Sequence, residues 1–434
     1  MGVLRVDPAK GLRGEIRVPA DKSLTHRAIL LAAVSDRAVR VGRPLDSADT
    51  AATLGAIEAC GATVDGDLGD ELRIEGVGLR GLRPAPAIDC ANAGTLMRLL
   101  TGLLVGQEGD RIVLDGDESL RERPMGRIAA PLRAMGASIW TAPGGTPPIV
   151  VSGGGPLRGV AHELPVASAQ VKSCLLLAGL FAEGVTTVRE PGASRDHTER
   201  LLRAAGVQLI EVDGGVAVSG PVAGLTLPDV EVPGDPSSAA PLAVAAALRA
   251  DPEVRLVGVN LNPGRIGLFR VMERMGVPIR IEPASDVAGE PCGDVVVGRA
   301  DRLECTDVAA PEVPSMIDEL PLVGLLAAFA IGTTRVRGAA ELRVKETDRI
   351  TAAVDSLRAL GVQAQEREDG FEVTGAPRLV GGDVASRGDH RMAMLGAVAG
   401  LASTEGVRIT GFEAVEVSYP GFARDLGALG AVGR

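Results

Sequence analysis

Residues 352–375, AAVDSLRALGVQAQEREDGFEVTG, contain the pattern from which the fold can be read. A short helical stretch with spaced apolar residues ends at Gly361, and two β-prone segments separated by a turn follow it. Glycine directly after a helix is a typical stop signal, because it adopts the left-handed backbone conformation without strain. The stretch therefore predicts a helix, a glycine stop and a β-hairpin.

This pattern recurs along the whole chain. The glycines that end the six helices are Gly61, Gly136, Gly206, Gly276, Gly361 and Gly430. Each copy also carries an apolar helix whose first turn opens with polar or small residues, as in DKSLTHRAILLAAV (21–34) and SAQVKSCLLLAGLFA (168–182). A period of about 70 residues indicates one supersecondary unit per copy, because no unit can bury its apolar face alone. The unit is predicted to be βαβαββ.

The two ends of the chain complement each other. The last copy stops at GALGAVGR without its hairpin, while the chain opens with two strand-like segments, VLRV (3–6) and GEIRVP (14–19). The simplest solution is that the N-terminus completes the C-terminal half. We therefore predict an α/β (α+β) protein of two similar domains with three units each. The domains are residues 21–230 and residues 1–20 plus 231–434, and a two-strand hinge joins them.

Composition limits the class of protein. A chain of 434 residues exceeds what one core usually supports, and the net charge of −11 argues against nucleic acid or an anionic membrane as the main partner. The first ten residues lack the apolar core of a signal peptide, so a cytoplasmic location is expected. The five cysteines show no metal-type spacing, which predicts reduced structural thiols and no catalytic metal.

The starts of the six apolar helices are the places where chemistry is expected. The first turn of a helix has unpaired N–H groups and a partial positive charge, which together favour anions. Arginine binds carboxylate and phosphate through two parallel hydrogen bonds. Five arginines occur in or beside these segments, namely Arg27, Arg98, Arg123, Arg349 and Arg391. A structural salt bridge could explain any one of them, but together they favour a polyanionic substrate.

Two acidic residues accompany these cations. Asp318 stands at the head of an apolar helix in SMIDELP, where a helix-capping role and a catalytic role are both open. Glu346 lies beside Lys345 in VKETDR, where a solvated surface position and a catalytic role are both open. A carboxylate near cations in a cleft can act as a base or an acid. The histidines at helix starts, such as His26 and His197, are expected to be structural hydrogen-bond partners.

Seven motifs then resemble one family, 5-enolpyruvylshikimate-3-phosphate synthase. In chain order they are DKSLTHR (21–27), NAGTLMR (92–98), RERPMG (121–126), SAQVKS (168–173), SRDHTE (194–199), RVKETDR (343–349) and DHRMAM (389–394). The resemblance implies an inside-out α/β barrel in each domain, with the domains closing around shikimate 3-phosphate and phosphoenolpyruvate. It implies transfer of the enolpyruvyl group to the 5-hydroxyl through a tetrahedral ketal phosphate, with release of phosphate. No cofactor is expected, and a monomer is the expected state.

The motifs also imply which residues bind the substrates. For shikimate 3-phosphate they are Lys22, Ser23, Arg27, Ser168, Gln170, Ser194 and Lys345. For phosphoenolpyruvate they are Lys22, Gly94, Arg123, Gln170, Arg349 and Arg391. Asn92, Ala169 and Asp318 are also implied at substrate-binding positions. The family commonly has serine where this chain has Ala169, and some members have lysine where this chain has Val417. Both departures remove a polar contact that the family otherwise provides.

The resemblance also implies catalytic roles. Asp318 takes the proton of the 5-hydroxyl, and either Lys22 or Glu346 protonates C3 of phosphoenolpyruvate. The alternative within this fold is the sister transferase that acts on UDP-N-acetylglucosamine. That family usually has a reactive cysteine in the loop that here reads DGDESLRERPMG (115–126), without cysteine. The alternative from another class is a catalytically silent anion-binding protein, which would not need Lys22, Asp318 and Glu346 together.

Overall fold

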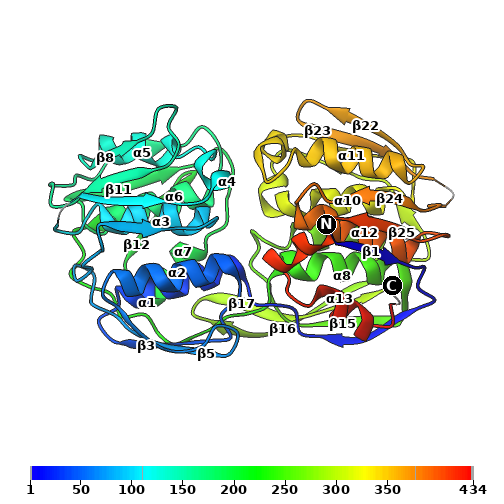
Figure 1. Cartoon of the computed structure of the whole chain (residues 1–434), viewed down its shortest axis with the longest axis horizontal. Coiled ribbons are helices and arrows are strands. Elements are labelled where there is room, and N and C mark those ends of the chain that lie inside the picture. Colours follow the sequence, from blue (N-terminus) through cyan, green and yellow to red (C-terminus); the bar gives the residue numbers. More distant parts are fainter. Residues whose placement is uncertain (1, 110, 377, 432–434) are drawn as a thin grey trace. The chain divides into compact units, whose positions relative to one another are not determined.

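The computed structural model (Figure 1) describes residues 2–109, 111–376 and 378–431. The chain divides into two compact units, which we treat separately. The N-terminal domain comprises Ala20–Val232 and Asp286–Glu290. The C-terminal domain comprises the residues up to Pro19, together with Pro233–Ser285 and the chain from Pro291 onward.

The N-terminal domain contains three four-stranded sheets with the same topology. Their strand orders are β14-β3-β5-β4, β6-β7-β9-β8 and β10-β11-β13-β12. In each sheet the first pair is parallel and the other two pairs are antiparallel. The strands are β3 Ala38–Gly42, β4 Thr63–Gly66, β5 Glu71–Glu75, β6 Ala87–Asp89, β7 Arg111–Asp115, β8 Ser138–Thr141, β9 Ile149–Ser152, β10 Ala161–Glu163, β11 Gly184–Arg189, β12 Leu209–Val212, β13 Gly215–Gly220 and β14 Val230–Glu231.

Three buried helices occupy the interior of this domain. They are α1 Lys22–Ala33, α3 Gly94–Leu104 and α6 Ala169–Gly179, and α3 contacts both of the others. The remaining helices are α2 Ala48–Ala59, α4 Glu118–Arg121, α5 Gly126–Ala134 and α7 His197–Ala204. In these three interior helices the partly exposed residues lie in the first two turns, and the later turns are buried.

The C-terminal domain repeats this arrangement with strands from the N-terminus. Its main sheets have the orders β16-β17-β15-β2, β19-β21-β23-β22 and β1-β25-β24, and a two-stranded sheet pairs β18 with β20. The strands are β1 Val3–Val6, β2 Leu12–Ile16, β15 Ala250–Asn260, β16 Ile279–Val287, β17 Glu290–Gly298, β18 Leu303–Glu304, β19 Asp307–Val308, β20 Ala330–Ile331, β21 Thr333–Val336, β22 Gln363–Arg367, β23 Gly370–Thr374, β24 Gly382–Ala385 and β25 Val407–Thr410.

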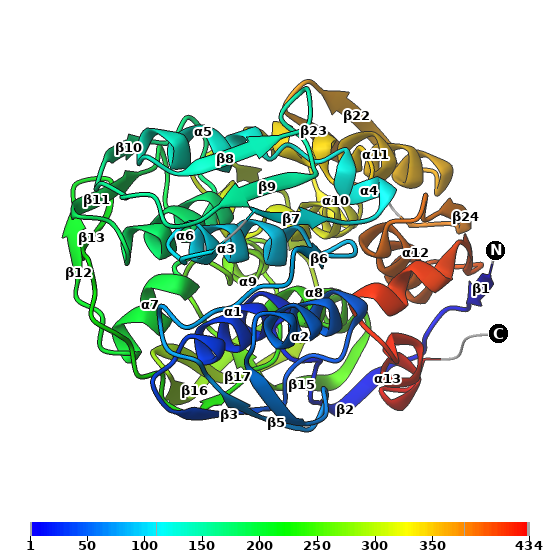
Figure 2. The same ribbon diagram turned by 60° about the vertical axis from the view of Figure 1, so that its left-hand side comes forward.

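The N-terminal strands complete the C-terminal half, as the sequence predicts. Strand β2 pairs in parallel with β15, and β1 pairs antiparallel with β25, in the position that a hairpin strand takes in the other units. The interior helices are α8 Pro236–Arg249, α10 Leu320–Ala327 and α12 His390–Ala402, which contact one another. The others are α9 Gly267–Arg274, α11 Arg349–Ala359 and α13 Phe422–Ala428. Figure 2 shows α12 beside strand β24. The predicted fold class is therefore confirmed.

One connection was not anticipated from the sequence. The tip of the β16–β17 hairpin, Asp286–Glu290, belongs to the N-terminal domain although both strands lie largely in the C-terminal domain. There Glu290 accepts a 2.7 Å hydrogen bond from Nδ1 of His197, and both side chains are buried. The prediction of two connecting segments is therefore incomplete. Within the described residues, no helix combines the length and the apolar character that a membrane span requires.

The six glycines that define the repeat all have positive φ. Gly61, Gly136, Gly206, Gly276, Gly361 and Gly430 have φ between 85° and 102°. Each one stands two residues after the last helical residue, so each ends its helix in the left-handed conformation. This backbone requirement is the physical reason why the repeat is visible in the sequence.

Replacing Gly361 by alanine should destabilise the protein by about 1–2 kcal/mol, because alanine in the left-handed region is strained. A Cβ at this position would contact nothing within 4 Å, so the change in stability would come from backbone strain alone. The matched control is Gly55→Ala inside α2, where a Cβ also meets nothing within 4 Å. There alanine should stabilise by about 0.5–1 kcal/mol. Urea unfolding midpoints measure both, and shifts of the same sign would contradict the assignment.

Candidate functional site

In the N-terminal domain, the start of α1 presents the predicted Lys22, Ser23 and Arg27. Asp21 caps the helix by accepting the Leu24 amide at 3.0 Å. The Lys22 ammonium donates to Asp49 on α2 at 3.0 Å. This partner holds the lysine side chain at the helix start, where Lys22 remains partly exposed.

Arg27 lies deeper and connects α1 to two other helices. Its guanidinium donates to the Ser23 carbonyl at 2.9 Å, to the Thr198 hydroxyl at 2.8 Å and to the Ser173 hydroxyl at 3.1 Å. Burial lowers the pKa of Arg27 to about 10, against the opposing effect of nearby Glu199. Arg27 therefore remains charged at neutral pH and ties α1 to α6 and α7.

The start of α3 forms a second group of cations. The N-cap residue of α3 makes no side-chain capping bond. A Cβ on Gly94 would come within 2.8 Å of Arg98 and 3.3 Å of Arg123, so only glycine leaves the space beside the two guanidinium groups open. Gln170 of α6 accepts from Arg98 at 2.7 Å and donates to Thr95 at 2.9 Å.

Arg123 is held by the predicted Asn92. The guanidinium donates to the Asn92 carbonyl at 3.2 Å and also to its side-chain oxygen. The Asn92 amide in turn donates to Asp117, the N-cap residue of α4, at 2.8 and 3.0 Å. These bonds bring Asn92, Gly94, Arg123 and Gln170 together at one helix start.

At the start of α6, Ser168 caps the helix, with its hydroxyl accepting the Val171 amide at 3.4 Å. Ala169 follows as the first helical residue, and its methyl group offers no hydrogen bond. The Ser194 hydroxyl donates to Glu190 at 2.7 Å, and the same carboxylate accepts the Ser168 amide at 2.7 Å. The structure therefore connects Ser168 and Ser194 through Glu190, a residue that sequence reasoning missed.

In the C-terminal domain, one buried arginine organises the predicted acidic residues. The Arg349 guanidinium donates to Asp318 at 2.9 Å, to Glu346 at 2.7 Å and to Asp389 at 2.7 Å. The Lys345 ammonium lies 3.4 Å from the same Asp318 oxygen. The guanidinium is almost fully buried, and its three carboxylate partners outweigh that burial and raise the pKa of Arg349.

Asp318 is not the N-cap residue of α10, which is Glu319. Asp318 lies in a 3₁₀ turn, Ile317–Glu319, before α10, and α10 has no side-chain capping bond. The aspartate instead turns toward Arg349 and Lys345. Glu346 lies at the surface, with its side chain 38% exposed, and it pairs with the buried Arg349. Arg349 and His390 outweigh the effect of desolvation and lower the pKa of Glu346 to about 2. Glu346 is therefore ionised at neutral pH.

Arg391, at the start of α12, contacts a different set of groups. It donates to the Ser237 carbonyl at 3.1 Å and lies 3.5 Å from Glu319. Its Nε is buried and has no hydrogen-bond partner among the described residues. Val417, where some members of the resembled family have lysine, lies about half exposed at the end of a 3₁₀ turn, Phe412–Val417.

Sequence reasoning missed several supporting residues. They are Asp49, Lys172, Glu190, Glu319 and Asp389, each of which holds a predicted residue or a neighbour of one. Asp389 could have been noticed as the N-cap of α12, and Lys172 as a rare lysine inside an apolar helix. Asp49, Glu190 and Glu319 contact residues that are distant from them in the sequence. Among the described residues, no group of three or more histidine, cysteine or acidic side chains is arranged to hold a metal ion.

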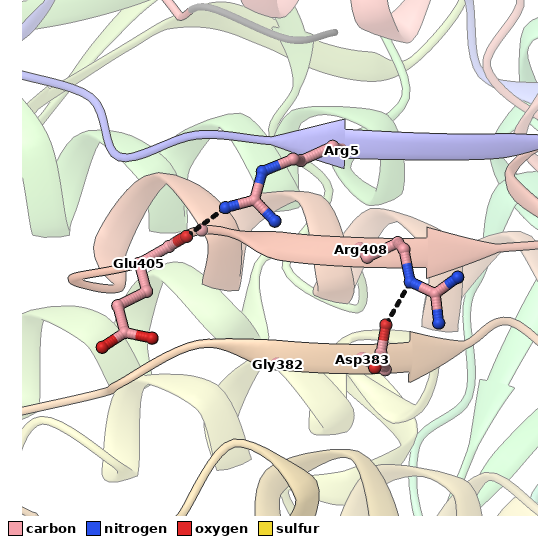
Figure 3. A pocket seen from close by; sticks show the side chains of 6 residues that line it. Arg5, Gly382, Asp383, Glu405 and Arg408 are labelled. Carbon is pink, nitrogen blue, oxygen red and sulfur yellow. Dashed lines mark hydrogen bonds and ion pairs between the residues drawn. The ribbon is translucent and has the colours of Figure 1, made fainter.

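A surface cavity of about 290 Å³ elsewhere in the C-terminal domain does not include these residues. It is lined by Arg5, Gly382, Asp383, Glu405, Gly406 and Arg408. Figure 3 shows Arg408 bonded to Asp383 and Arg5 bonded to the Glu405 carbonyl. The cavity lies beyond the C-terminal end of α12, whereas Arg391 lies at the N-terminal end, roughly 18 Å away along the helix. Its cations are already paired, so it is not the candidate site.

Known proteins resemble this chain over its full length. The sequence model of the EPSP synthase family (3-phosphoshikimate 1-carboxyvinyltransferase) matches residues 6–426. A protein named 3-phosphoshikimate 1-carboxyvinyltransferase from Synechococcus sp. (strain JA-3-3Ab) is 45% identical, covering 98% of this chain and 96% of its own. One of the same name from Thermus thermophilus is 47% identical, covering 98% of both chains.

Solved structures agree in fold. The structure of EPSP synthase from Acinetobacter baumannii superposes with a TM-score of 0.91 and 40% identity, covering 100% of this chain and 99% of that one. The enolpyruvyl transferase NikO from Streptomyces tendae superposes with a TM-score of 0.79 at 20% identity, covering 100% of this chain and 98% of that one, which indicates a shared fold.

The buried His26 predicts a pH-dependent loss of stability. Its Nδ1 is 2.6 Å from the Thr53 hydroxyl, and burial lowers its pKa to about 3, although Asp49 opposes this effect. Because an unfolded histidine takes up a proton near pH 6.5, unfolding becomes more favourable as pH falls from about 6.5 toward 3.

Between pH 7 and pH 5 this histidine should cost the wild type about 2 kcal/mol of stability. His26→Asn removes the titrating group, so its urea unfolding midpoint should change less between the two pH values. Other titrating groups are common to both proteins and cancel in the comparison. An equal pH dependence in the two proteins would show that His26 is protonated in the native state.

Proposed function

The chain belongs to the EPSP synthase family, and on that premise we propose that it transfers the enolpyruvyl group of phosphoenolpyruvate to the 5-hydroxyl of shikimate 3-phosphate. The observation that carries the proposal is the family match over residues 6–426, which includes every helix start described above. The cations gathered at those helix starts support it, because both substrates are polyanions.

We assign the phosphate end of shikimate 3-phosphate to the N-terminal domain and two of the phosphoenolpyruvate contacts to the C-terminal domain. The N-terminal domain provides Ser168, Ser194 and Arg27 for shikimate 3-phosphate, since these hydroxyl and guanidinium groups lie around the starts of α1, α6 and α7. The C-terminal domain provides Arg349 and Arg391 for phosphoenolpyruvate. The buried Nε of Arg391 has no acceptor among the described residues, so it can donate to a bound anion.

The addition step needs a base and an acid. In our proposal Asp318 takes the proton of the 5-hydroxyl as its oxygen bonds to C2, and a proton adds to C3. Because Glu346 is ionised near neutral pH, it has no proton to give in this structure. The Lys22 amino group donates a hydrogen bond to Asp49 and lies at a helix start of the N-terminal domain, so we assign the donor role to Lys22.

The resulting tetrahedral ketal phosphate then collapses. C3 returns its proton, the bond from C2 to the phosphate oxygen breaks, and inorganic phosphate leaves. Atoms and protons balance over the two steps, so the product is the enol ether plus phosphate. Arginine groups stabilise the charge that develops on the departing phosphate.

The chain lacks the feature expected of the alternative transferase for UDP-N-acetylglucosamine. Loop 115–126 contains no cysteine. The cysteine nearest to this loop in sequence, Cys90, is fully buried at the end of β6, and burial raises its pKa to about 12. Such a thiol is a poor nucleophile at neutral pH.

The function is tested by measuring phosphate release from phosphoenolpyruvate with two acceptors in parallel. We expect release with shikimate 3-phosphate and none with UDP-N-acetylglucosamine. Release with the sugar nucleotide alone would identify the sister activity. No release with either acceptor would favour an anion-binding protein without catalysis.

Asp318→Asn should lower kcat at least about 100-fold, because a positioned general base contributes about 10²–10⁴ in rate. The KM for phosphoenolpyruvate should change much less, since the asparagine still accepts a hydrogen bond from Arg349. Asp355→Asn is the matched control, as Asp355 forms an exposed ion pair with Arg387. Steady-state kinetics distinguish a general base from a residue that only binds substrate. A change confined to KM would exclude Asp318 as the base.

A further inference from the structure

A buried triad of charges lies beside the serines of the N-terminal domain. We define it as Lys172 on α6, Glu190 just after β11, and Glu199 on α7. The Lys172 ammonium is 2.9 Å from Glu190 and 2.8 Å from Glu199, and all three side chains are at most 7% exposed. Burial opposes the charge of Lys172, but the two carboxylates outweigh it and raise the pKa of the lysine. The triad therefore joins one ammonium to two carboxyl groups.

Glu190 does more than neutralise the lysine. One carboxylate oxygen accepts the Ser168 amide at 2.7 Å, and the other accepts both the Ser194 hydroxyl at 2.7 Å and the Lys172 ammonium. Lys172 also lies 3.4 Å from the Ser194 carbonyl. Two loop residues that are 26 positions apart in the sequence are thus held by a single carboxylate.

We propose that Glu190 is a positioning residue for the phosphate end of the shikimate 3-phosphate site, an inference that rests on the proposed function. It acts through Ser168 and Ser194 and does not touch the phosphate itself. One oxygen fixes the backbone before α6, so that the serine stays at the helix start. The other keeps the Ser194 hydroxyl at the same helix start before any substrate arrives.

Because a hydroxyl has one proton, Ser194 can donate either to Glu190 or to the phosphate, and substrate binding must exchange one acceptor for the other. In the structure the Ser194 proton points to Glu190, so Ser194 donates to a phosphate oxygen only after turning away from the carboxylate. Lys172 remains on the same Glu190 oxygen and keeps it paired during the exchange. The buried carboxylate is therefore never left without a partner, which would be costly.

Neutralising Lys172 does not by itself require Glu190, because Glu199 already pairs with the ammonium at 2.8 Å. Glutamine could not replace Glu190, because its amide has one acceptor oxygen and would point an N–H₂ group at either Ser194 and Lys172 or the Ser168 amide. The residue type is thus explained by the two serines and the lysine together.

The test is Glu190→Gln with steady-state kinetics for both substrates. We expect the KM for shikimate 3-phosphate to rise about tenfold or more, the size of a lost hydrogen bond to a charged group. The kcat and the KM for phosphoenolpyruvate should stay within about twofold, as expected when only ground-state binding is lost. Glu163→Gln is the matched control, because Glu163 forms an exposed ion pair with Arg189 in the same sheet.

A second variant distinguishes the loss of positioning from misfolding. Glu190→Asp keeps the charge beside Lys172, but its carboxylate is one methylene shorter and cannot reach both serines. It should raise the same KM while the melting temperature stays near that of the wild type. Calorimetry with shikimate 3-phosphate and with unphosphorylated shikimate should show that the loss is confined to the phosphorylated ligand.

The outcomes separate this inference from the proposed function. A wild type that neither binds nor turns over shikimate 3-phosphate overturns the proposed function, and this inference with it. A functional wild type with an unchanged KM in both variants overturns the positioning role alone. A general loss, with kcat and both KM values altered and the melting temperature lowered, would show that the triad serves fold stability. This outcome also overturns the positioning role.

Discussion

The burial of one apolar helix in each repeat is the constraint on which the rest of the structure depends. α1, α3 and α6 in one domain, and α8, α10 and α12 in the other, are packed almost entirely within their own cores. A helix surrounded in this way can present polar groups only at its ends, and its N-terminus offers free amides and positive potential. The cores therefore force the chemistry of the chain to the helix starts, where the cations and serines are found.

Several side chains at helix starts are held by a carboxylate from another element. Asp49 holds Lys22, Glu190 holds Ser168 and Ser194, and Asp389 shares Arg349 with Asp318 and Glu346. Buried cations need such partners, because an unpaired charge in an apolar interior is costly. The same pairing has a chemical consequence, since it keeps Glu346 ionised and leaves lysine as the better proton donor in the proposed reaction.

Much of the fold could be predicted because its signals are local. Helix-ending glycines reflect a backbone conformation that one residue adopts alone, so Gly61 and Gly361 mark the repeat without any knowledge of neighbours. The orphan strands at the N-terminus were placed correctly by counting units. The placement of the β16–β17 hairpin tip in the N-terminal domain was not foreseen, because it depends on the contact between His197 and Glu290.

The sequence by itself determined the repeat, the fold class, the helix starts as the chemical positions and the resemblance that names the substrates. These features are set by backbone propensity and by motifs of neighbouring residues. Only the tertiary structure decided that Asp318 pairs with Arg349 and Lys345 and does not cap its helix, and that Glu190 joins Ser168 to Ser194. Such pairings depend on distances between residues far apart in the chain, and a linear pattern of residue types does not contain those distances.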